Sequence, residues 1–382
     1  MKTIVCDCGT GFMKCGFAEN EAPIVFSTAV GRPVVTRRDV FRSENIQLKA
    51  VYVGDEIEEI AAHTAVDITH PIENGVVRDW EGMRLVWEYT FYTRLGLEDL
   101  SECQIMLTEA PQNPTANRER MCREMFEHFG FKRVYFVLQG ILGLYSCGLQ
   151  TGVVVDSGDG VTHIVPIFDG YASRPTIRRL DIAGRDVTRQ LAKLLCGRGY
   201  AFRTDQSLGK ARRLKEKHCY VSQDYQTDTK LAKETTVLVC RDGGVMLDYE
   251  RFAAPEILFS PEKFGKESSG LPAALFSAIQ DSGIDMRREL YGNIVLCGGT
   301  TMMQGFSERL EKELALLCGK LRGGPGTAKE FGIRVRSPRE RSSSVYIGGT
   351  VLAGVISEIE SAWVTDGEWR RDGAQALSKF QS

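Results

Sequence analysis

The sequence predicts an α/β protein with mixed or parallel sheets, divided into two similar lobes. Its 382 residues exceed the roughly 250 to 300 residues at which a single hydrophobic core stops growing. Short β-branched runs alternate along the chain with helical patterns, which is typical of α/β folds. A motif near the N-terminus also returns in the middle of the chain, which indicates two related halves.

The alternating elements can be placed by residue number. We expect strands over 3–5, 134–137, 153–155 and 294–296, and helices over 117–129, 183–195 and 307–317. The first of these helices follows Asn113-Pro114-Thr115, a good capping neighbourhood, and precedes Gly130. The stretches 36–49 and 321–329 lack periodicity and predict loops. Neither stretch marks a clear boundary between domains. We therefore expect the polypeptide to cross between the two lobes more than once.

The composition excludes several classes of protein. With 43% hydrophobic and 26% charged residues, the chain has the composition of a soluble globular protein. A net charge of -2 gives no reason to expect nucleic acid or an anionic membrane as a partner. An uncharged run of 22 residues, 134–155, contains two glutamines and four glycines. It predicts a buried helix and a buried strand instead of a membrane span.

Cysteine usage and the N-terminus indicate an intracellular protein. The 11 cysteines form no Cys-x-x-Cys pair and are odd in number, which favours a reducing compartment such as the cytosol or nucleus. The first residues, MKTIVCD, read as a strand and not as a secretion signal. We expect Cys6 and Cys8 to point to opposite faces of that strand and to form no metal site.

The repeated motif is the most informative feature. Residues 3–14 read TIVCDCGTGFMK and residues 152–163 read GVVVDSGDGVTH, so that Asp7 and Asp156 lie 149 residues apart. Each copy is an apolar strand, then Asp-x-Gly-x-Gly, then a second short run. Small residues at a hairpin turn let backbone N–H groups approach an anion closely. Two such hairpins predict a clamp on one polyphosphate, with ATP and a divalent metal held in a cleft between the lobes.

The residue types at the two loops suit a triphosphate with a divalent ion. Asp7 and Asp156, at strand ends, can supply carboxylates near the metal, usually through water for Mg²⁺. Lys14 and Thr10 can contact the terminal phosphates, and Asp159 lies on the opposing loop.

Other polar residues nearby allow two interpretations. Gln139 is either a satisfied core amide or a group that positions an attacking water, since an unsatisfied buried amide costs about 1 to 3 kcal/mol. His163 either joins that water or is a structural histidine. A third glycine cluster, at 298–299, follows a strand and places backbone near a ligand. The chain has no Walker A or Gly-x-Gly-x-x-Gly pattern, so the nucleotide site is of another type.

At these loops the sequence resembles the actin family, whose fold is shared with heat-shock ATPases and sugar kinases. The resemblance covers nearly the whole chain, through VCDCGTGFMKCGFA, VGRP, YVGDE, PIENGVVRDW, LTEAPQNPTANRE, DSGDGVTH, RRLDIAGRDVT, KEKHCYV, NIVLCGGTTM and SVYIGG. Three features are similar to the actin-related subfamily that joins actin-related protein 3 in the actin-nucleating complex. They are KLAKETTVLV, NIQLKAVYVGDE and the asparagine of PIENG. TEAP and TFY are more similar to conventional actin.

The resemblance implies two lobes with fixed boundaries. The first would comprise 1–147 plus 345–382, with a small inserted subdomain at about 33–70. The second would comprise 148–344, with an insertion at about 183–269. The segment 139–145 would be the hinge between them, softened by Gly140 and Gly143.

The resemblance also implies roles for individual residues around ATP and Mg²⁺ or Ca²⁺. Asp7 and Asp156 would hold the metal through water and, with Gln139 and His163, form the catalytic set. The phosphates would be held by Thr10, Gly11, Phe12 and Lys14 on one side and by Gly158, Asp159, Gly160 and Val161 on the other. The nucleoside would be lined by Gly184, Arg212, Lys215, Glu216, Gly299, Thr300 and Met303.

Some residues depart from the family pattern. Met303 replaces a tyrosine beside the adenine and Ser342 replaces a lysine near the same ring, so we expect looser binding of the base. Actin makes contacts across its filament with a loop that has an apolar tip. The corresponding segment here, KFGKESSG, carries the charged residues Lys263 and Lys266 and is less apolar. Assembly beside other subunits is therefore expected more than self-assembly.

The function that the resemblance implies is that of an ATP-binding subunit of an actin-nucleating, branch-forming complex in the cytoplasmic cytoskeleton. Its partners would be actin filaments, actin-related protein 3 and the other subunits. Weak ATPase activity would serve as a conformational switch. The alternatives are a divergent actin that forms filaments alone, or a small-molecule kinase of the same broad fold. The kinase would need a sugar-binding acid, for which the sequence offers no evident candidate.

Overall fold

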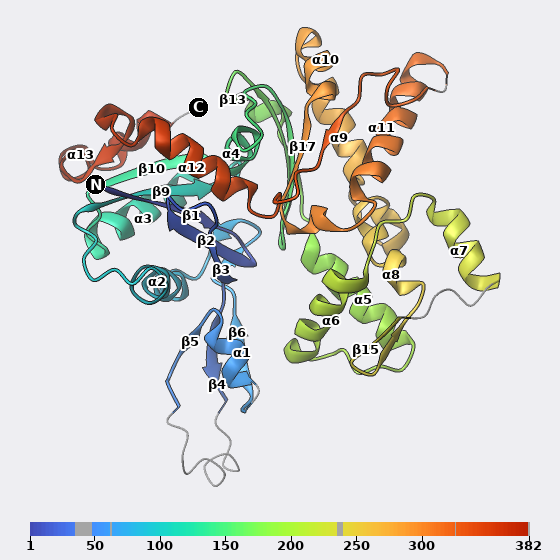
Figure 1. The fold of residues 1–382 in the computed structure, drawn as a ribbon, viewed down its shortest axis with the longest axis horizontal. Helices are drawn as coiled ribbons and strands as arrows, with labels where there is room; N and C mark the ends of the chain where they lie inside the picture. The colour runs from blue at the N-terminus through green and yellow to red at the C-terminus, as the bar shows by residue number, and fades with distance from the viewer. Residues whose placement is uncertain (35–47, 62, 235–239, 325, 381–382) are drawn as a thin grey trace. The chain divides into compact units, whose positions relative to one another are not determined.

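The computed structural model describes residues 1–34, 48–61, 63–234, 240–324 and 326–380. The chain forms two compact units, the first of Met1–Ser146 with Val345–Ser382 and the second of Cys147–Ser344. Each unit is built on its own mixed sheet flanked by helices (Figure 1). The loop predicted over 36–49 falls almost entirely on 35–47, outside the described residues.

The first unit contains a six-stranded sheet in the order β19-β10-β9-β1-β2-β3. Its strands are β1 (Lys2–Cys8), β2 (Phe12–Phe17), β3 (Ile24–Ser27), β9 (Cys103–Glu109), β10 (Arg133–Leu138) and β19 (Val364–Thr365). The three central strands β1, β9 and β10 run parallel, whereas β1 and β2 form an antiparallel hairpin. The parallel strands therefore end at one common edge of the sheet.

Helices cover both faces of this sheet because its strands are buried on both sides. On β1, Ile4 and Cys6 belong to one hydrophobic cluster and Val5 belongs to another, as expected when successive side chains point to opposite faces. The first face is covered by α2 (Trp80–Glu88), η1 (Tyr89–Arg94), α3 (Thr115–Arg123), η2 (Glu124–His128), α13 (Asp366–Asp372) and η8 (Gly373–Phe380). The second face is covered by α4 (Gln139–Tyr145) and α12 (Ser344–Ile356), with η7 (Glu360–Ala362) after α12.

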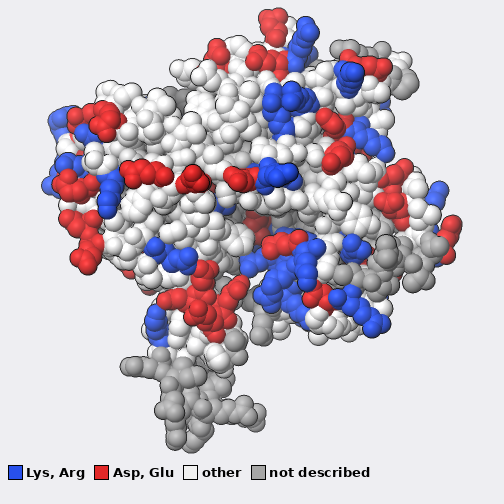
Figure 2. Space-filling view, in the orientation of Figure 1, with Lys and Arg blue, Asp and Glu red and all other residues white. Residues whose placement is uncertain are grey.

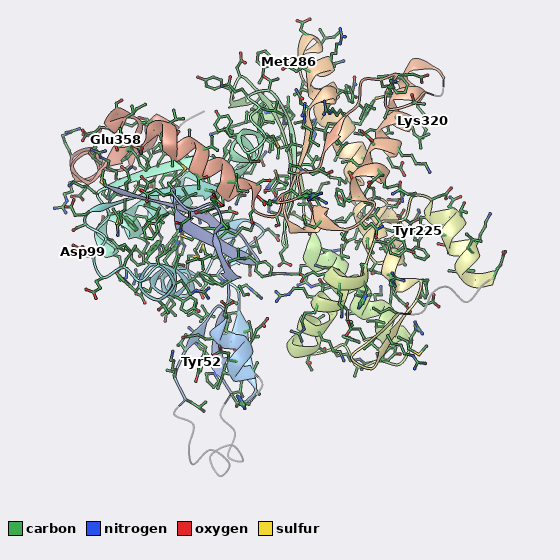
Figure 3. The ribbon with its side chains drawn as sticks, in the orientation of Figure 1. Tyr52, Asp99, Tyr225, Met286, Lys320 and Glu358 are labelled. Atoms are coloured by element: carbon green, nitrogen blue, oxygen red, sulfur yellow. The ribbon has the colours of Figure 1, made fainter. Side chains whose placement is uncertain are left out.

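Smaller elements extend the first unit. A three-stranded sheet, β5-β4-β6, is made of Tyr52–Val53, Val30–Pro33 and Val66–Thr69 and packs against α1 (Glu56–Ala61). Tyr52, labelled in Figure 3, belongs to the small hydrophobic cluster of this sheet. A two-stranded hairpin follows, of β7 (Ile72–Glu73) and β8 (Val76–Val77).

The sheet of the second unit repeats the strand order of the first. Its order is β13-β12-β11-β17-β18, with β14 also on β12. The strands are β11 (Gly152–Ser157), β12 (Thr162–Phe168), β13 (Tyr171–Ala172), β14 (Arg178–Leu180), β17 (Ile294–Cys297) and β18 (Val335–Arg336). As in β3-β2-β1-β9-β10, two antiparallel pairings are followed by two parallel ones. The sequence repeat thus corresponds to a repeated fold.

Helices of the second unit enclose one large hydrophobic cluster. They are α5 (Gly184–Gly197), α6 (Asp205–His218), α9 (Leu271–Gln280), α10 (Ile284–Gly292) and α11 (Phe306–Arg322). The unit also contains α7 (Tyr225–Glu234) and α8 (Glu250–Ala253). Shorter elements are η3 (Arg174–Thr176), η4 (Pro255–Leu258), η5 (Pro261–Phe264), η6 (Gly299–Met302) and the hairpin of β15 (Cys240–Asp242) and β16 (Val245–Leu247). Lys and Arg side chains gather over α5 and α6 (Figure 2), so the small net charge of the chain conceals a locally basic surface.

Most elements predicted from the sequence are confirmed, and the exceptions have physical reasons. The uncharged run 134–155 divides into the end of β10, α4 and the start of β11, and no helix in the described residues could cross a membrane. The helix predicted to start near 117 begins at Thr115, and Asn113 does not cap it because Pro114 occupies the N-cap position. Gly130 does follow its last turn, with φ of 74°.

The prediction that Cys6 and Cys8 point to opposite faces of the strand was wrong. Residues two apart in a strand share a face, and the two Sγ atoms lie 3.7 Å apart. Both side chains are buried in the same hydrophobic cluster.

Candidate functional site

The first predicted loop is the turn of the β1–β2 hairpin. Asp7 and Lys14 lie opposite each other in its register, and Lys14 Nζ is 3.3 Å from Asp7 Oδ2. The Asp7 carboxylate is almost fully buried, with 2% of the residue exposed. Burying a carboxylate is costly unless hydrogen-bond donors surround it, and Lys14 supplies one of them.

Two more donors reach Asp7 from neighbouring elements. Thr108 Oγ1, near the end of β9, donates to Asp7 Oδ1 at 2.8 Å. Gln139 Nε2, in the first residue of α4, donates to the same oxygen at 2.9 Å. These residues meet because β1, β9 and β10 are adjacent and parallel, so their carboxyl ends share one edge, where ligands bind in open α/β sheets.

The turn itself is anchored by main-chain and hydroxyl contacts. Thr10 Oγ1 accepts a hydrogen bond from the Gly75 N–H at 2.9 Å, and the Gly11 carbonyl accepts from Thr28 N at 3.1 Å. Phe12 begins β2 directly after the turn. Because Thr10 acts as an acceptor toward Gly75, its hydroxyl hydrogen can donate to an anion.

The second predicted loop has the same construction in the second unit. Asp156 on β11 lies opposite His163 on β12, as Asp7 lies opposite Lys14. The Gly158 carbonyl accepts from Gly184 N at 3.0 Å and from Thr300 Oγ1 at 2.6 Å. The turn is therefore tied to the start of α5 and to η6.

The Asp159 carboxylate is already paired with an arginine of the same unit. Arg185 Nε donates to its Oδ2 at 2.9 Å, and a second guanidinium nitrogen lies 2.7 Å away. Arg185 was not among the residues predicted for the site. What Asp159 can offer to a phosphate is thus its backbone N–H, together with those of Gly160 and Val161 on the same turn.

Gly184 lies where only a residue without a side chain fits. A Cβ there would lie 2.5 Å from Thr300 Oγ1 and 3.3 Å from Lys215 Nζ. Lys215 is buried and donates to the Gly184 carbonyl at 3.1 Å, and burial lowers the pKa of its amine. The result is a narrow cradle of backbone, hydroxyl and ammonium groups around Gly184.

His163 is a buried histidine on β12. The residue is 2% exposed, and within the described part of the chain its Nε2 has no hydrogen-bond partner. Burial, and then the positive charge of Arg179, lower the pKa of His163 to about 4. The imidazole is therefore neutral at pH 7 and can hydrogen-bond a water or ligand atom without adding charge.

The structure groups the predicted residues within each unit. In the first unit it brings together Asp7, Lys14 and Gln139; in the second it brings together Gly158, Gly184, Lys215 and Thr300. Of the other nucleoside residues, Arg212 and Glu216 lie on α6 near Lys215, Gly299 begins η6, and Met303 is buried in the core of the second unit. The expected loss of an aromatic face at Met303, and of a cation at half-buried Ser342, remains a prediction.

These features fit a phosphate ligand with a hydrated cation. Each unit presents a carboxylate on the strand that enters the turn, and divalent cations prefer oxygen ligands. In the described part of the chain, the Nε2 of buried His163 has no hydrogen-bond partner, which packing alone leaves unexplained. A buried polar atom of this kind calls for a ligand or water.

Comparison with known proteins agrees with this geometry. The family model described as actin matches residues 1–380. The chain belongs to the actin family. Three relatives, all named actin-related protein 2, come from Acanthamoeba castellanii, Schizosaccharomyces pombe and Saccharomyces cerevisiae. Each is 44% identical over 99% of this chain and covers 97 to 98% of the relative.

Both levels of the resemblance found in the sequence are confirmed by these matches. The actin family was identified from its loops, and the subfamily of actin-related protein 2 from stretches such as KLAKETTVLV. Membership of the actin family also accounts for the repeated strand order of the two sheets.

Sequence reasoning missed Thr108 and Arg185. Thr108 is a polar residue at the carboxyl end of a central parallel strand, which is a usual position for functional groups. The pattern LTEAP contained it but did not single it out. Arg185 directly follows Gly184 in RRLDIAGRDVT, and nothing in the sequence indicates that it pairs with Asp159 instead of a phosphate.

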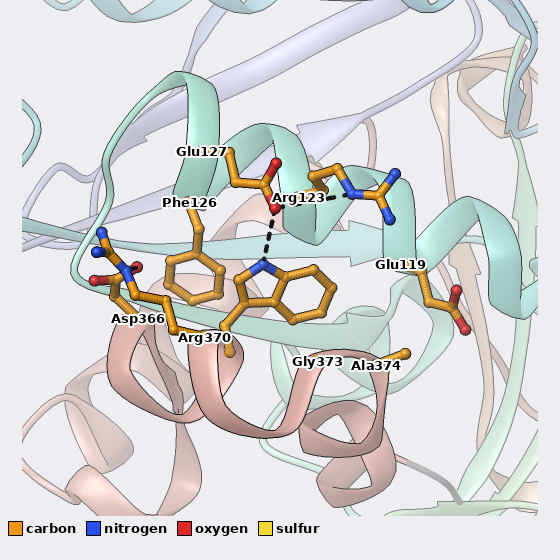
Figure 4. Close-up of a pocket in the computed structure, with 9 residues that line it drawn as sticks. Glu119, Arg123, Phe126, Glu127, Asp366, Arg370, Gly373 and Ala374 are labelled. Carbon is orange, nitrogen blue, oxygen red and sulfur yellow. Dashed lines mark hydrogen bonds and ion pairs between the residues drawn. The ribbon is translucent and has the colours of Figure 1, made fainter.

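A separate pocket of about 550 Å³ lies in the first unit of this actin-family chain (Figure 4). Its walls come from α3, η2, α13 and η8 and are lined by Glu119, Arg123, Phe126, Glu127, Asp366, Trp369, Arg370, Gly373 and Ala374. Arg370 pairs with Asp366 at 2.9 Å, and Trp369 Nε1 donates to Glu127 at 3.4 Å. The charges here are largely neutralised within the wall, and none of the predicted nucleotide residues lines this pocket.

Proposed function

We propose that this chain is an ATP-binding, actin-related subunit of an actin-nucleating complex. The observation that carries the proposal is the pair of matched hairpins, each with its aspartate on the strand that enters the turn, in a chain that aligns end to end with proteins named actin-related protein 2. Its partners are actin filaments, actin-related protein 3 and the other subunits of that complex. Its location is the cytoplasmic cytoskeleton.

ATP is bound with Mg²⁺ or Ca²⁺ by residues of both units. Thr10, Gly11, Phe12 and Lys14 hold the phosphates from the first unit, and the turn from Gly158 to Val161 holds them from the second. The nucleoside lies against Gly184, Arg212, Lys215, Glu216, Gly299, Thr300 and Met303. Asp7 and Asp156 hold the cation through water, and the cation neutralises phosphate charge. The Gly184 cradle and the buried donors around Asp7 support this arrangement.

The chain is a weak ATPase that uses the bound nucleotide as a conformational switch. Gln139 and His163 orient water beside the phosphates, since Gln139 is held to Asp7 and His163 is neutral, with no partner for its Nε2 among the described residues. Neither residue is a strong base at pH 7, which suits slow hydrolysis. The segment 139–145 is the hinge of this switch.

Replacing Asp7 with asparagine is expected to weaken ATP binding by about 10- to 100-fold, the usual cost of disturbing groups around a bound metal. The amide keeps the shape of the carboxylate but cannot attract a cation. Titration of the purified full chain with ATP and Mg²⁺, followed by calorimetry, measures the effect. Chelating the metal with EDTA should bring the wild type close to the variant.

Asp55→Asn provides the matched control for this titration. Asp55 is a surface aspartate of the same unit that pairs with Arg94 and is not part of the site, so its substitution should leave ATP affinity unchanged. A wild-type chain that binds no ATP at millimolar concentration would disprove the ATP proposal. Equal affinities for the wild type and the Asp7 variant would remove Asp7 from the site.

Purification of the tagged chain from its own cells is expected to yield a multi-subunit assembly that contains actin-related protein 3. In this chain, two ion pairs hold the loop with which conventional actin makes contacts across its filament. Lys263 pairs with Glu256 at 3.2 Å, and Lys266 pairs with Asp186 at 3.4 Å. Native mass spectrometry should find a mass well above the 42.5 kDa of one chain. Lys263→Ala with Lys266→Ala tests whether these lysines oppose self-assembly.

The alternative functions give different results in the same preparation. A conventional actin would pellet as the pure chain above a critical concentration, without actin-related protein 3. A small-molecule kinase would transfer phosphate from ATP to a sugar. Either result in place of the assembly would overturn the proposal.

A further inference from the structure

Thr108 connects the two side chains on which the proposed site depends. It lies on β9, between β1 and β10, and is 2% exposed. Its Oγ1 is 2.8 Å from Asp7 Oδ1 and 3.4 Å from Gln139 Nε2. Gln139 Nε2 is in turn 2.9 Å from the same Asp7 oxygen, so the three side chains form a closed triangle.

The hydrogen-bonding capacity of each group fixes the direction of every bond in this triangle. A threonine hydroxyl has one hydrogen, and here it is donated to Asp7, which leaves the lone pairs of Oγ1 toward Gln139. An ionised carboxylate only accepts, so the atom of the Gln139 amide that faces Asp7 is its nitrogen. The carbonyl Oε1 of Gln139 therefore points away from Asp7 and remains an acceptor for another group.

In the second unit, the residue equivalent to Thr108 is a cysteine and has no hydroxyl. Asp156 lies beside Cys297 on the parallel strand β17. In the first unit Cys6 lies beside Leu107 on β9, which places Thr108 beside Asp7 in the equivalent position. A thiol is a weak donor compared with a hydroxyl. Thr108 therefore offers Asp7 a stronger donor than the Cys297 thiol can offer Asp156.

We infer that Thr108 is a positioning residue for ATP hydrolysis. It holds the amide of Gln139 in one orientation, with Nε2 on Asp7 and Oε1 directed to accept a proton-bearing water. The inference rests on the proposed ATP-binding function and adds to it a residue that helps Asp7 hold the Gln139 amide in place. Without the hydroxyl, the amide loses its contact with Oγ1 and is held less firmly beside Asp7.

Three variants of the full chain test this role. Thr108→Val keeps the β-branched shape in the buried strand and removes the hydroxyl, whereas Thr108→Ser keeps the hydroxyl. Thr3→Val is the matched control, because Thr3 is another buried threonine of the same sheet whose Oγ1 accepts from Gln104 Nε2 at 2.8 Å. It should cost similar stability without touching Asp7.

Two measurements are made on each variant. The first, on the chain labelled with ¹⁵N-glutamine and without added nucleotide, follows the side-chain amide signal of Gln139, assigned by its loss in Gln139→Ala. Thr108→Val should shift this signal toward that of exposed glutamines, and Thr3→Val should not. The second is single-turnover hydrolysis of bound ATP, which should slow at least about tenfold in Thr108→Val and stay within about threefold of wild type in Thr108→Ser. ATP affinity should change by less than about threefold.

The other possible results would contradict either the role of Thr108 or the proposed function. An unmoved Gln139 signal, or unchanged hydrolysis in Thr108→Val, overturns the inference. So does the same slowing when Gln139 is already alanine, because Thr108 would then not act through Gln139. A wild type that binds ATP without measurable hydrolysis overturns the inference and leaves ATP binding intact. A wild type that binds no ATP overturns the proposed function itself.

Discussion

Replacing Glu256 with glutamine is expected to lower the free energy of unfolding of the second unit by about 3 kcal/mol. The Glu256 side chain is 0% exposed and that of Arg309 is 6% exposed. Two guanidinium nitrogens lie 3.2 Å from the carboxylate. Glutamine keeps the shape of glutamate but leaves the buried guanidinium without this counter-ion. Thermal unfolding should show the loss as a fall in Tm of roughly 6 to 12 °C.

The surroundings of this ion pair explain why the loss cannot be relieved locally. Arg309 is held by the Ser222 carbonyl at 2.6 Å, so it cannot turn toward solvent without breaking that bond. It still pairs with Glu313 at 2.8 Å, which places the expected loss at the lower end of the usual 3 to 5 kcal/mol. The pair joins η4 to α11, so its loss should loosen the packing of that part of the unit.

Two further variants separate the ion pair from general effects of substitution. Glu262→Gln changes an exposed residue of the neighbouring η5 and should shift stability by less than about 0.5 kcal/mol. Replacing Glu256 and Arg309 together with methionine removes both buried charges and should recover most of the loss. A single variant as stable as wild type, or a double variant worse than the single, would contradict the role assigned to the pair.

What could be predicted from the sequence was what is encoded locally. The hairpins at Asp7 and Asp156 were predicted because an apolar run, an aspartate and two spaced glycines are contiguous in the chain. Cross-strand neighbours such as Asp7 with Lys14 follow from the short turn alone. The error at Cys6 and Cys8 was one of local geometry, since side chains two apart in a strand share a face.

What could not be predicted depends on the order of strands in the sheet. Thr108 reaches Asp7 across 101 residues of sequence only because β9 lies directly beside β1. Arg185 reaches Asp159 across 26 residues because the start of α5 is bonded to the Gly158 turn. One-sequence periodicity does not report such neighbours, so the loops were found while the side chains that orient their carboxylates were not.

Acidification from pH 6.5 to about 4 is expected to remove about 3 kcal/mol of stability through His163 alone. Burial is the main reason that the pKa of His163 falls to about 4, whereas a histidine in the unfolded chain titrates near 6.5. Between these values the unfolded state binds a proton that the native state does not. Stability is therefore unaffected by His163 above pH 6.5 and falls by about 1.4 kcal/mol per pH unit below it.

The contribution of His163 is isolated by comparison with a variant that cannot titrate. Urea unfolding of the wild type and of His163→Gln should give a stability difference that changes by about 3 kcal/mol between pH 7 and pH 4. His63→Gln, at an exposed histidine, should follow the wild type. A ¹³C-histidine NMR titration should show one signal, missing in His163→Gln, that changes near pH 4.

The same titration shows whether the His163 imidazole in the proposed site is neutral or charged. A neutral imidazole at pH 7 can bond a water through Nε2 but adds no positive charge beside the phosphates, so ATP affinity should not weaken between pH 6 and 8 through this residue. Its charged neighbours are Arg179, which lowers the pKa, and Asp181, which raises it. A signal that titrates near 6.5 would mean that water reaches the ring freely, and His163 would then become a pH-dependent cation at the phosphates.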